Sequence, residues 1–219
     1  EGVTEIACRL FNECVSLDDV SLPDSLTSIE SGSFRLCTSL NSITIPDNVT
    51  AIESYAFNSC INLISINLSE ELISIGSNAF QSCTSLINIT LPDGVTDIRS
   101  SAFKNCSILI NIDLSEDLET IGNNALENCT SLSSITIPDS VTSIGISAFD
   151  QCSSLGGITF LATSAPSLIN AIPYPDWQSI LTTTITVPLN TIVSYQNAGN
   201  GTTYAGLDIN ESIDASSAD

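Results

Sequence analysis

The chain has 219 residues, of which 42% are apolar, so its length and composition allow one or two domains with a buried core. Four Lys and Arg residues stand against 25 Asp and Glu residues, which gives a formal net charge of −21. Such a charge repels nucleic acid and anionic membranes, and no apolar run reaches the roughly 18 residues that a membrane span needs. The sequence therefore predicts neither nucleic-acid binding nor membrane insertion.

A period of 23 residues runs from the first residues to about residue 160. A Phe or Leu lies three residues before each periodic cysteine, and a Leu lies three residues after it. A fixed period of this length is typical of a solenoid, because one unit cannot bury its own apolar face. The seven periodic cysteines are Cys14, Cys37, Cys60, Cys83, Cys106, Cys129 and Cys152.

Each unit predicts three short elements in a fixed order. The pattern Leu40-x-x-Ile43-x-Ile45 alternates with period two and predicts a strand, and Pro46-Asp47 predicts a turn after it. Residues 49–52 predict a second short strand, and residues 54–60 predict a single turn of helix. Like residues then stack into inner columns of Phe, Cys, Leu and Ile.

The unit "I-x-x-x-A-F-x-x-C-x-x-L-x-x-I-x-I-P-x-x-V-x-x-I" resembles the BspA-like (Treponema pallidum-type) class of leucine-rich repeats over residues 1 to about 160. The class occurs in surface proteins of bacteria and some protists. The resemblance implies a curved solenoid whose L-x-x-I-x-I strands form one parallel sheet. It also implies an extracellular or cell-surface location and adhesion to proteins or glycans. Departures from the pattern are Leu126 for Phe, and Ser69 and Ser115 for the turn Pro.

The last 60 residues interrupt the period. A strand is expected at 184–188, and a capping region at 161–207, where Tyr174, Trp177 and Tyr195 pack as part of the cap. The ending "T-V-P … Y" is similar to the caps of BspA-like arrays. Residues 208–219 form an acidic tail, expected to be disordered or a linker. The predicted fold class is a mainly β repeat solenoid of about seven units over residues 1–160, the first incomplete, with a C-terminal cap.

The first residues align with the middle of a unit, since 1–6 match 93–98. We therefore expect either further repeats upstream or a first coil that docks onto another molecule. An uncovered edge of a solenoid favours pairing. Head-to-tail stacking into a filament is thus a hypothesis that the sequence raises.

The cysteines have a structural interpretation. The chain contains no His, which excludes His-dependent catalytic triads and His-ligated metals. Cysteines stacked one coil apart point the same way and lie too far apart for disulfides, so the column is predicted to hold buried, free thiols. Cys8 falls at a position predicted to be exposed, and either a disulfide or an unpaired thiol remains open for it.

An acidic column follows the turns. Aspartate in a solvated turn is the favoured interpretation, because a good calcium site needs six to eight oxygen ligands. Weak calcium binding stays open for Glu70, Asp93, Glu116 and Asp139. The full column is Glu1, Asp24, Asp47, Glu70, Asp93, Glu116 and Asp139.

The outward positions of L-x-x-I-x-I predict an interaction face of small polar side chains. The face lacks Trp, Tyr and Arg, the residues that favour tight interfaces, so weak adhesion strengthened by many copies is expected. The predicted face consists of Asp19, Ser21, Ser42, Thr44, Ser65, Asn67, Asn88, Thr90, Asn111, Asp113, Ser134 and Thr136.

Seven N-x-S/T sequons also occur. Asn105 and Asn128 adjoin column cysteines, where a glycan would crowd the next coil. The candidate glycosylation sites are therefore Asn48, Asn67, Asn88, Asn200 and Asn210, with Asn48 preferred because it lies in a turn.

Three functions were weighed. The leading prediction is a non-enzymatic recognition or adhesion module outside the cell, without a cofactor. The alternative is a structural subunit that stacks on copies of itself. An enzyme that uses carboxylates is disfavoured, because no irregularity that would form a pocket interrupts the array.

Overall fold

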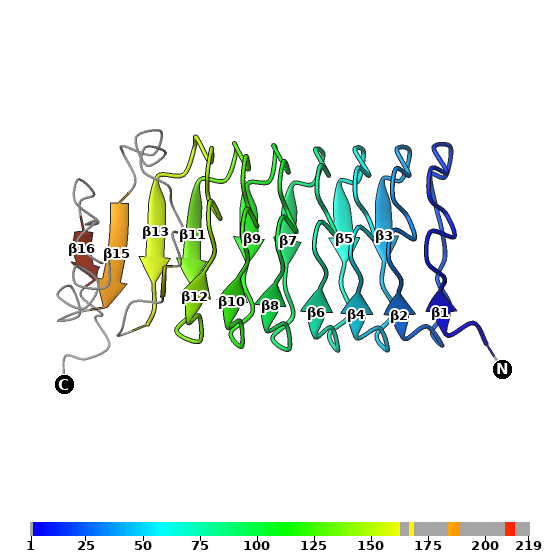
Figure 1. Ribbon diagram of the computed structural model, residues 1–219, viewed down its shortest axis with the longest axis horizontal. Coiled ribbons are helices and arrows are strands. Elements are labelled where there is room, and N and C mark those ends of the chain that lie inside the picture. The colour runs from blue at the N-terminus through cyan, green and yellow to red at the C-terminus, as the bar shows by residue number, and fades with distance from the viewer. Residues whose placement is uncertain (1, 163–166, 169–183, 189–208, 213–219) are drawn as a thin grey trace.

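Each 23-residue unit forms one coil, and the coils lie side by side in a row of about seven turns (Figure 1). The computed structural model describes residues 2–162, 167–168, 184–188 and 209–212. Each coil has two short strands joined by an arc of turns. No helix is present in these residues.

The first row of strands is one parallel sheet of eight strands. Each strand has two residues and pairs with the strand one coil away, as Ile6 pairs with Ile29. A constant register of this kind places the apolar residue of every coil over its counterpart. The strands are β1 (Glu5–Ile6), β2 (Ser28–Ile29), β4 (Ala51–Ile52), β6 (Ser74–Ile75), β8 (Asp97–Ile98), β10 (Thr120–Ile121), β12 (Ser143–Ile144) and β14 (Ser167–Leu168).

The second row contains the L-x-x-I-x-I strands and is divided into three parallel sheets, β3–β5, β7–β9 and β11-β13-β15-β16. The expectation of one continuous sheet is therefore wrong, because pairing stops between β5 and β7 and between β9 and β11. The strands are β3 (Ser42–Thr44), β5 (Ser65–Asn67), β7 (Asn88–Thr90), β9 (Asn111–Asp113), β11 (Ser134–Ile137), β13 (Gly157–Phe160), β15 (Thr184–Pro188) and β16 (Ile209–Ser212).

Both breaks follow a coil in which Ser replaces the turn Pro. The Ser69 hydroxyl donates to the Asp47 carbonyl at 2.8 Å and accepts from the Glu71 amide at 3.2 Å. Ser115 makes the equivalent bonds one pair of coils later. The leucine before each Ser is only partly buried, whereas Leu91 before Pro92 is 3% exposed. The coils are thus grouped in pairs along this row.

The arc at 54–60 is a chain of turns, so the predicted turn of helix is wrong. Tyr55 and Ser59 have φ values of 62° and 60°, a left-handed conformation that interrupts a right-handed helix. Alternate amides also bond different coils. The Phe57 amide donates to the Ala79 carbonyl of the next coil at 2.8 Å, while the Asn58 amide donates within its own arc to Tyr55 at 3.1 Å.

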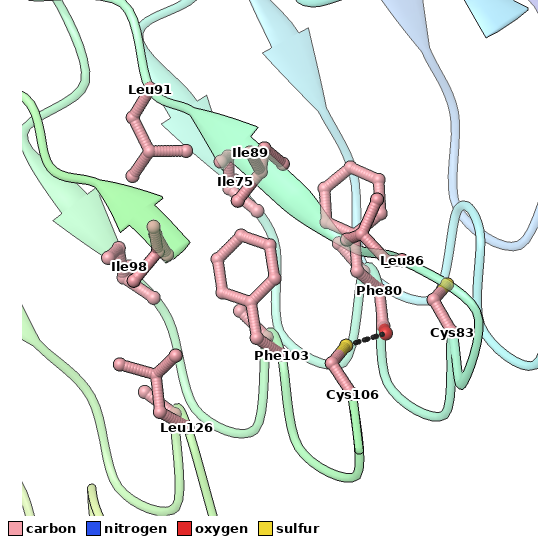
Figure 2. Close-up of a cluster of buried hydrophobic side chains, with 14 of the residues drawn as sticks. Ile75, Phe80, Cys83, Leu86, Ile89, Leu91, Ile98, Phe103, Cys106 and Leu126 are labelled. Atoms are coloured by element: carbon pink, nitrogen blue, oxygen red, sulfur yellow. Dashed lines mark hydrogen bonds between the residues drawn. The ribbon is translucent and has the colours of Figure 1, made fainter. Parts of the chain in front are cut away.

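The interior is filled by columns of identical residues (Figure 2). The rings of Phe57, Phe80 and Phe103 stack at centroid distances of 5.4 Å, with interplanar angles of 2° and 4°. Leu126 continues the position as an aliphatic side chain and is fully buried. Because each ring is covered by the ring of the next coil, the units are stable only as an array.

The column cysteines are hydrogen-bond donors inside the core. The Cys106 thiol donates to the Phe80 carbonyl at 3.2 Å (Figure 2), and Cys60 donates to Phe34 at 3.0 Å. Burial is the main cause that raises the pKa of Cys60 to about 12, and it raises the pKa of Cys83 well above the ordinary value. Six of the seven thiols are buried and free, as predicted, but Cys14 in the first coil is exposed.

Both strand rows continue past residue 160. The expected strand at 184–188 is confirmed as β15, and it pairs with β13. The tail, expected to lack structure, contains β16, which pairs with β15 from Ile185↔Ile209 onward. Tyr174, Trp177 and Tyr195 lie outside the described residues, so their packing and the domain limits stay predictions.

Replacing Phe80 by Ala should lower the free energy of unfolding by about 3–5 kcal/mol, because it leaves a cavity between two stacked rings. Phe80→Leu copies the natural Leu126 and should lose only the ring stacking, at about 0.5–1.5 kcal/mol for each of two neighbours. Urea unfolding followed by circular dichroism compares the two variants. Equal losses would contradict a column held by aromatic stacking.

Cysteine labelling should separate two thiols from the other six. With the native, reduced chain, iodoacetamide should modify Cys8 and Cys14, which are exposed, and should spare the six buried thiols because burial keeps them protonated. In denaturant all eight cysteines should react. Mass spectrometry of the native sample counts the adducts, and rapid modification of Cys60 or Cys83 would refute the buried column.

Candidate functional site: the strand face

The outer surface of the second strand row is the predicted interaction face, here called the strand face. All twelve predicted positions are exposed. In each strand the central isoleucine points inward, and its neighbours on both sides point to solvent, as in Ser42–Thr44. Asp19 and Ser21 are also exposed, but the first coil has no strand at this place. The sequence therefore located this surface correctly, while its use stays a prediction.

Polar side chains on the strand face bond one another within the pairs of coils. Asn67 donates to the Thr44 hydroxyl at 3.3 Å, and Thr90 donates to the Asp113 carboxylate at 3.0 Å. Asn111 donates to the other oxygen of Asp113 at 2.8 Å. These bonds hold short side chains in fixed positions, so little conformational entropy remains to be lost when a partner binds.

Two shallow grooves cross the strand face at the two sheet breaks. The first lies between β5 and β7, and its lining includes Asn67, Leu68, Glu70, Thr90 and Asp93. The second lies between β9 and β11, and its lining includes Asp113, Leu114, Glu116, Thr136 and Asp139. The grooves are equivalent positions two coils apart. Each combines a partly buried leucine with carboxylates.

Sequence reasoning missed an apolar row beside the strand face. Ile64, Ile87 and Ile110 occupy the position just before β5, β7 and β9, where the coils on either side have Asn41 and Ser133. Ile64 and Ile110 are 47% and 52% exposed. The signal was present in the aligned units, because three consecutive copies have isoleucine at an outward position.

The acidic column lies along the opposite edge of the strand face. Asp24, Asp47, Glu70, Asp93, Glu116 and Asp139 are all exposed, and Glu1 lies outside the described residues. In the part of the chain that the structure describes, no three His, Cys, Asp or Glu side chains are grouped to hold a metal ion. Weak calcium binding by Glu70, Asp93, Glu116 and Asp139 stays an untested prediction.

The other candidate residues are distributed over several surfaces. Cys8 is exposed and free, as expected for an unpaired thiol, and a disulfide with another chain stays a prediction. Asn48 is exposed, and its amide donates to the Asp24 carbonyl at 2.8 Å. Asn67 and Asn88 belong to the strand face, so a glycan on either would cover it. Asn200 lies outside the described residues, and Asn210 is in β16.

Membrane insertion was not expected. Within the described ranges, the structure contains no helix that is long and apolar enough to cross a membrane.

Comparison with known proteins agrees with this architecture. The family model described as "BspA type Leucine rich repeat region (6 copies)" matches residues 4–130 and 75–198. BspA-type repeats are non-catalytic binding modules, and the array of this chain is one. No curated protein matches the sequence.

Two solved structures extend the comparison. A leucine-rich repeat protein from Bacteroides ovatus is 26% identical with a TM-score of 0.73, over 96% of this chain and 52% of that protein. The chain therefore spans about half the length of that relative. The leucine-rich repeat protein of T. pallidum is 29% identical with a TM-score of 0.64, over 81% of this chain and 75% of that protein. The repeat, the coil geometry and the matched residues agree, and the chain belongs to the BspA-type leucine-rich repeat family.

Proposed function

We propose that the array is a recognition or adhesion module outside the cell or at its surface, and that its strand face binds proteins or glycans. The observation that carries this proposal is the strand face itself, in which twelve outward positions at one register are all exposed. A regular surface of this kind repeats the same contact on successive coils. Membership of the BspA-type family supports the extracellular location.

The chemistry of the face favours weak contacts that add together. Its side chains are Ser, Thr, Asn and Asp, which bond polar groups but bury little apolar area. Affinity for one partner molecule is then low, and many copies on one surface raise the overall strength by orders of magnitude. Adhesion between two surfaces uses this effect, whereas binding of a single soluble ligand does not.

Beads coated with the chain should adhere to cultured epithelial cells more than beads coated with albumin. Asn88→Arg with Ser134→Arg should reduce adhesion, because long cationic side chains then cover the strand face. Thr50→Arg with Thr142→Arg is the matched control, since both residues are exposed on the other strand row and the charge change is the same. Protease or glycosidase treatment of the cells distinguishes protein from glycan partners.

The counts of attached beads under flow decide the proposal. Attachment equal to that of albumin would refute adhesion. Attachment reduced equally by both double variants would show that the strand face is not the surface used.

A filament is the second candidate, because the first coil has an apolar surface that its own chain does not cover. Leu10 and Val15 are 57% and 54% exposed, and Cys14 is exposed although its six counterparts are buried. Either further repeats of a longer chain or the last coil of a second copy would cover this surface. Copies stacked in this way would continue both strand rows.

Light scattering at increasing concentration tests the filament. We expect a monomer at all concentrations if the module acts by recognition. Rods that lengthen with concentration, and that shorten in Leu10→Asp with Val15→Asp, would instead support end-to-end stacking. Ile73→Asp, a 54% exposed isoleucine in the middle of the array, is the control for a general effect of added charge.

A further inference from the structure

The isoleucine row is a continuous apolar edge along the strand face. The amide of Ile87 donates to the carbonyl of Ile64 at 3.3 Å, and the amide of Ile110 donates to Ile87 at 2.8 Å, so the three residues are stacked on adjacent coils. Ile61 and Ile108, both 41% exposed, lie close to this row in sequence. Isolated exposed isoleucines are common, but an apolar cluster on three successive coils is typical of an interaction surface.

The grooves add two apolar sites to the same surface. Leu68 and Leu114 line them and are only partly buried, whereas their counterparts Ile45, Leu91 and Ile137 are at most 3% exposed. The difference follows from the coils with Ser69 and Ser115, which end each pair. A side chain from a partner can therefore contact a leucine in each groove.

The charges around these apolar sites have one sign. Glu70 and Asp93 line the first groove, and Glu116, Asp117 and Asp139 line the second. The four basic residues are Arg9, Arg35, Arg99 and Lys104, and none belongs to the strand face or its grooves. Lys104 is also bound to Glu127 at 2.7 Å. The surface thus combines an apolar edge with an uncompensated acidic edge.

This combination selects among the surfaces that could cover the row. A second copy of the chain carries a net charge of −21 and would place acidic residues against acidic residues. An anionic membrane is repelled for the same reason. A basic protein segment with aliphatic side chains complements both edges, because Lys and Arg side chains have an apolar stem and a charged end.

We propose that the isoleucine row and the two grooves dock an extended basic segment of a partner protein, which deepens the recognition function proposed above and rests on it. Aliphatic side chains of the segment pack on Ile64, Ile87 and Ile110. Lysine or arginine stems pack on Leu68 and Leu114, and their charged ends lie near the groove carboxylates.

The spacing of the grooves defines the segment. Leu68 and Leu114 are two coils apart, and coils in a sheet are spaced at about 4.8 Å, so the grooves are roughly 10 Å apart. A polyproline II segment rises about 3.1 Å per residue with three residues per turn, and every third side chain points the same way at about 9.3 Å. Basic residues at every third position of such a segment match both grooves.

A labelled peptide of repeated Lys-Leu-Pro triplets is the probe, because its polyproline II form separates the lysine, leucine and proline faces. We expect its fluorescence anisotropy to rise with the concentration of the chain and the affinity to fall as salt increases. Peptides of Lys-Ser-Pro and Glu-Leu-Pro triplets should each bind about tenfold more weakly or not at all, since one lacks the apolar face and the other the charge.

Variants locate the binding surface. Ile64→Asn with Ile110→Ser introduces the residues that Asn41 and Ser133 already provide at the same position, so folding should be preserved while affinity falls about tenfold. Glu70→Gln with Glu116→Gln should also weaken binding and reduce its dependence on salt. Ile73→Thr and Glu119→Gln are the matched controls, because both residues are exposed in one row beside the other strand row.

Equal binding of the Lys and Glu peptides, or equal affinity of the chain and the isoleucine variant, would overturn the proposal, as would no binding by the unaltered chain. The isoleucine variant is also used in the bead experiment. Beads that still adhere with this variant would leave the recognition function intact and refute only this docking surface. Beads of the unaltered chain that fail to adhere, although the peptide binds, would refute adhesion alone.

Discussion

The structure depends on the hydrogen bonds between successive coils. In the arc, the amides of Phe34, Phe57, Phe80 and Phe103 each donate to a carbonyl of the next coil at 2.8 Å. In the first strand row, the same register pairs residue with residue over eight strands. These bonds satisfy buried backbone groups only if every coil has the same length and path. The constant period of 23 residues in the sequence is the direct consequence.

The fixed register also explains which side chains fill the core. Phe and Cys lie three residues apart in each arc, so the carbonyl of Phe80 lies within reach of the thiol of Cys106 on the following coil. A cysteine is small enough for the turn and can still donate a weak hydrogen bond. The thiols therefore serve packing, which accounts for a column of cysteines without a disulfide or a metal in the described coils.

Sequence periodicity predicted the solenoid, the two strands of each unit and the exposed strand face, because these features repeat in every copy. It did not predict the arc at 54–60, where Ala56, Phe57 and Cys60 fit a helical spacing equally well. The decision between helix and turns depends on bonds to the neighbouring coil, such as that from Phe57 to Ala79, which the sequence of one unit does not contain. The division of the second strand row escaped for a related reason, since Ser69 and Ser115 were interpreted only as modest departures.

The individual character of this chain lies in its departures from the repeat. Residues that follow the period are confined by the coils on both sides, as the fully buried Phe57 and Leu63 show. An outward position is free of that constraint, so a row such as Ile64, Ile87 and Ile110 is not required by packing. The Ser turns likewise keep the coil length but bring Leu68 and Leu114 towards the surface. Both departures meet on the strand face, and an array whose interior is nearly uniform acquires specificity from the few positions at which neighbouring coils differ.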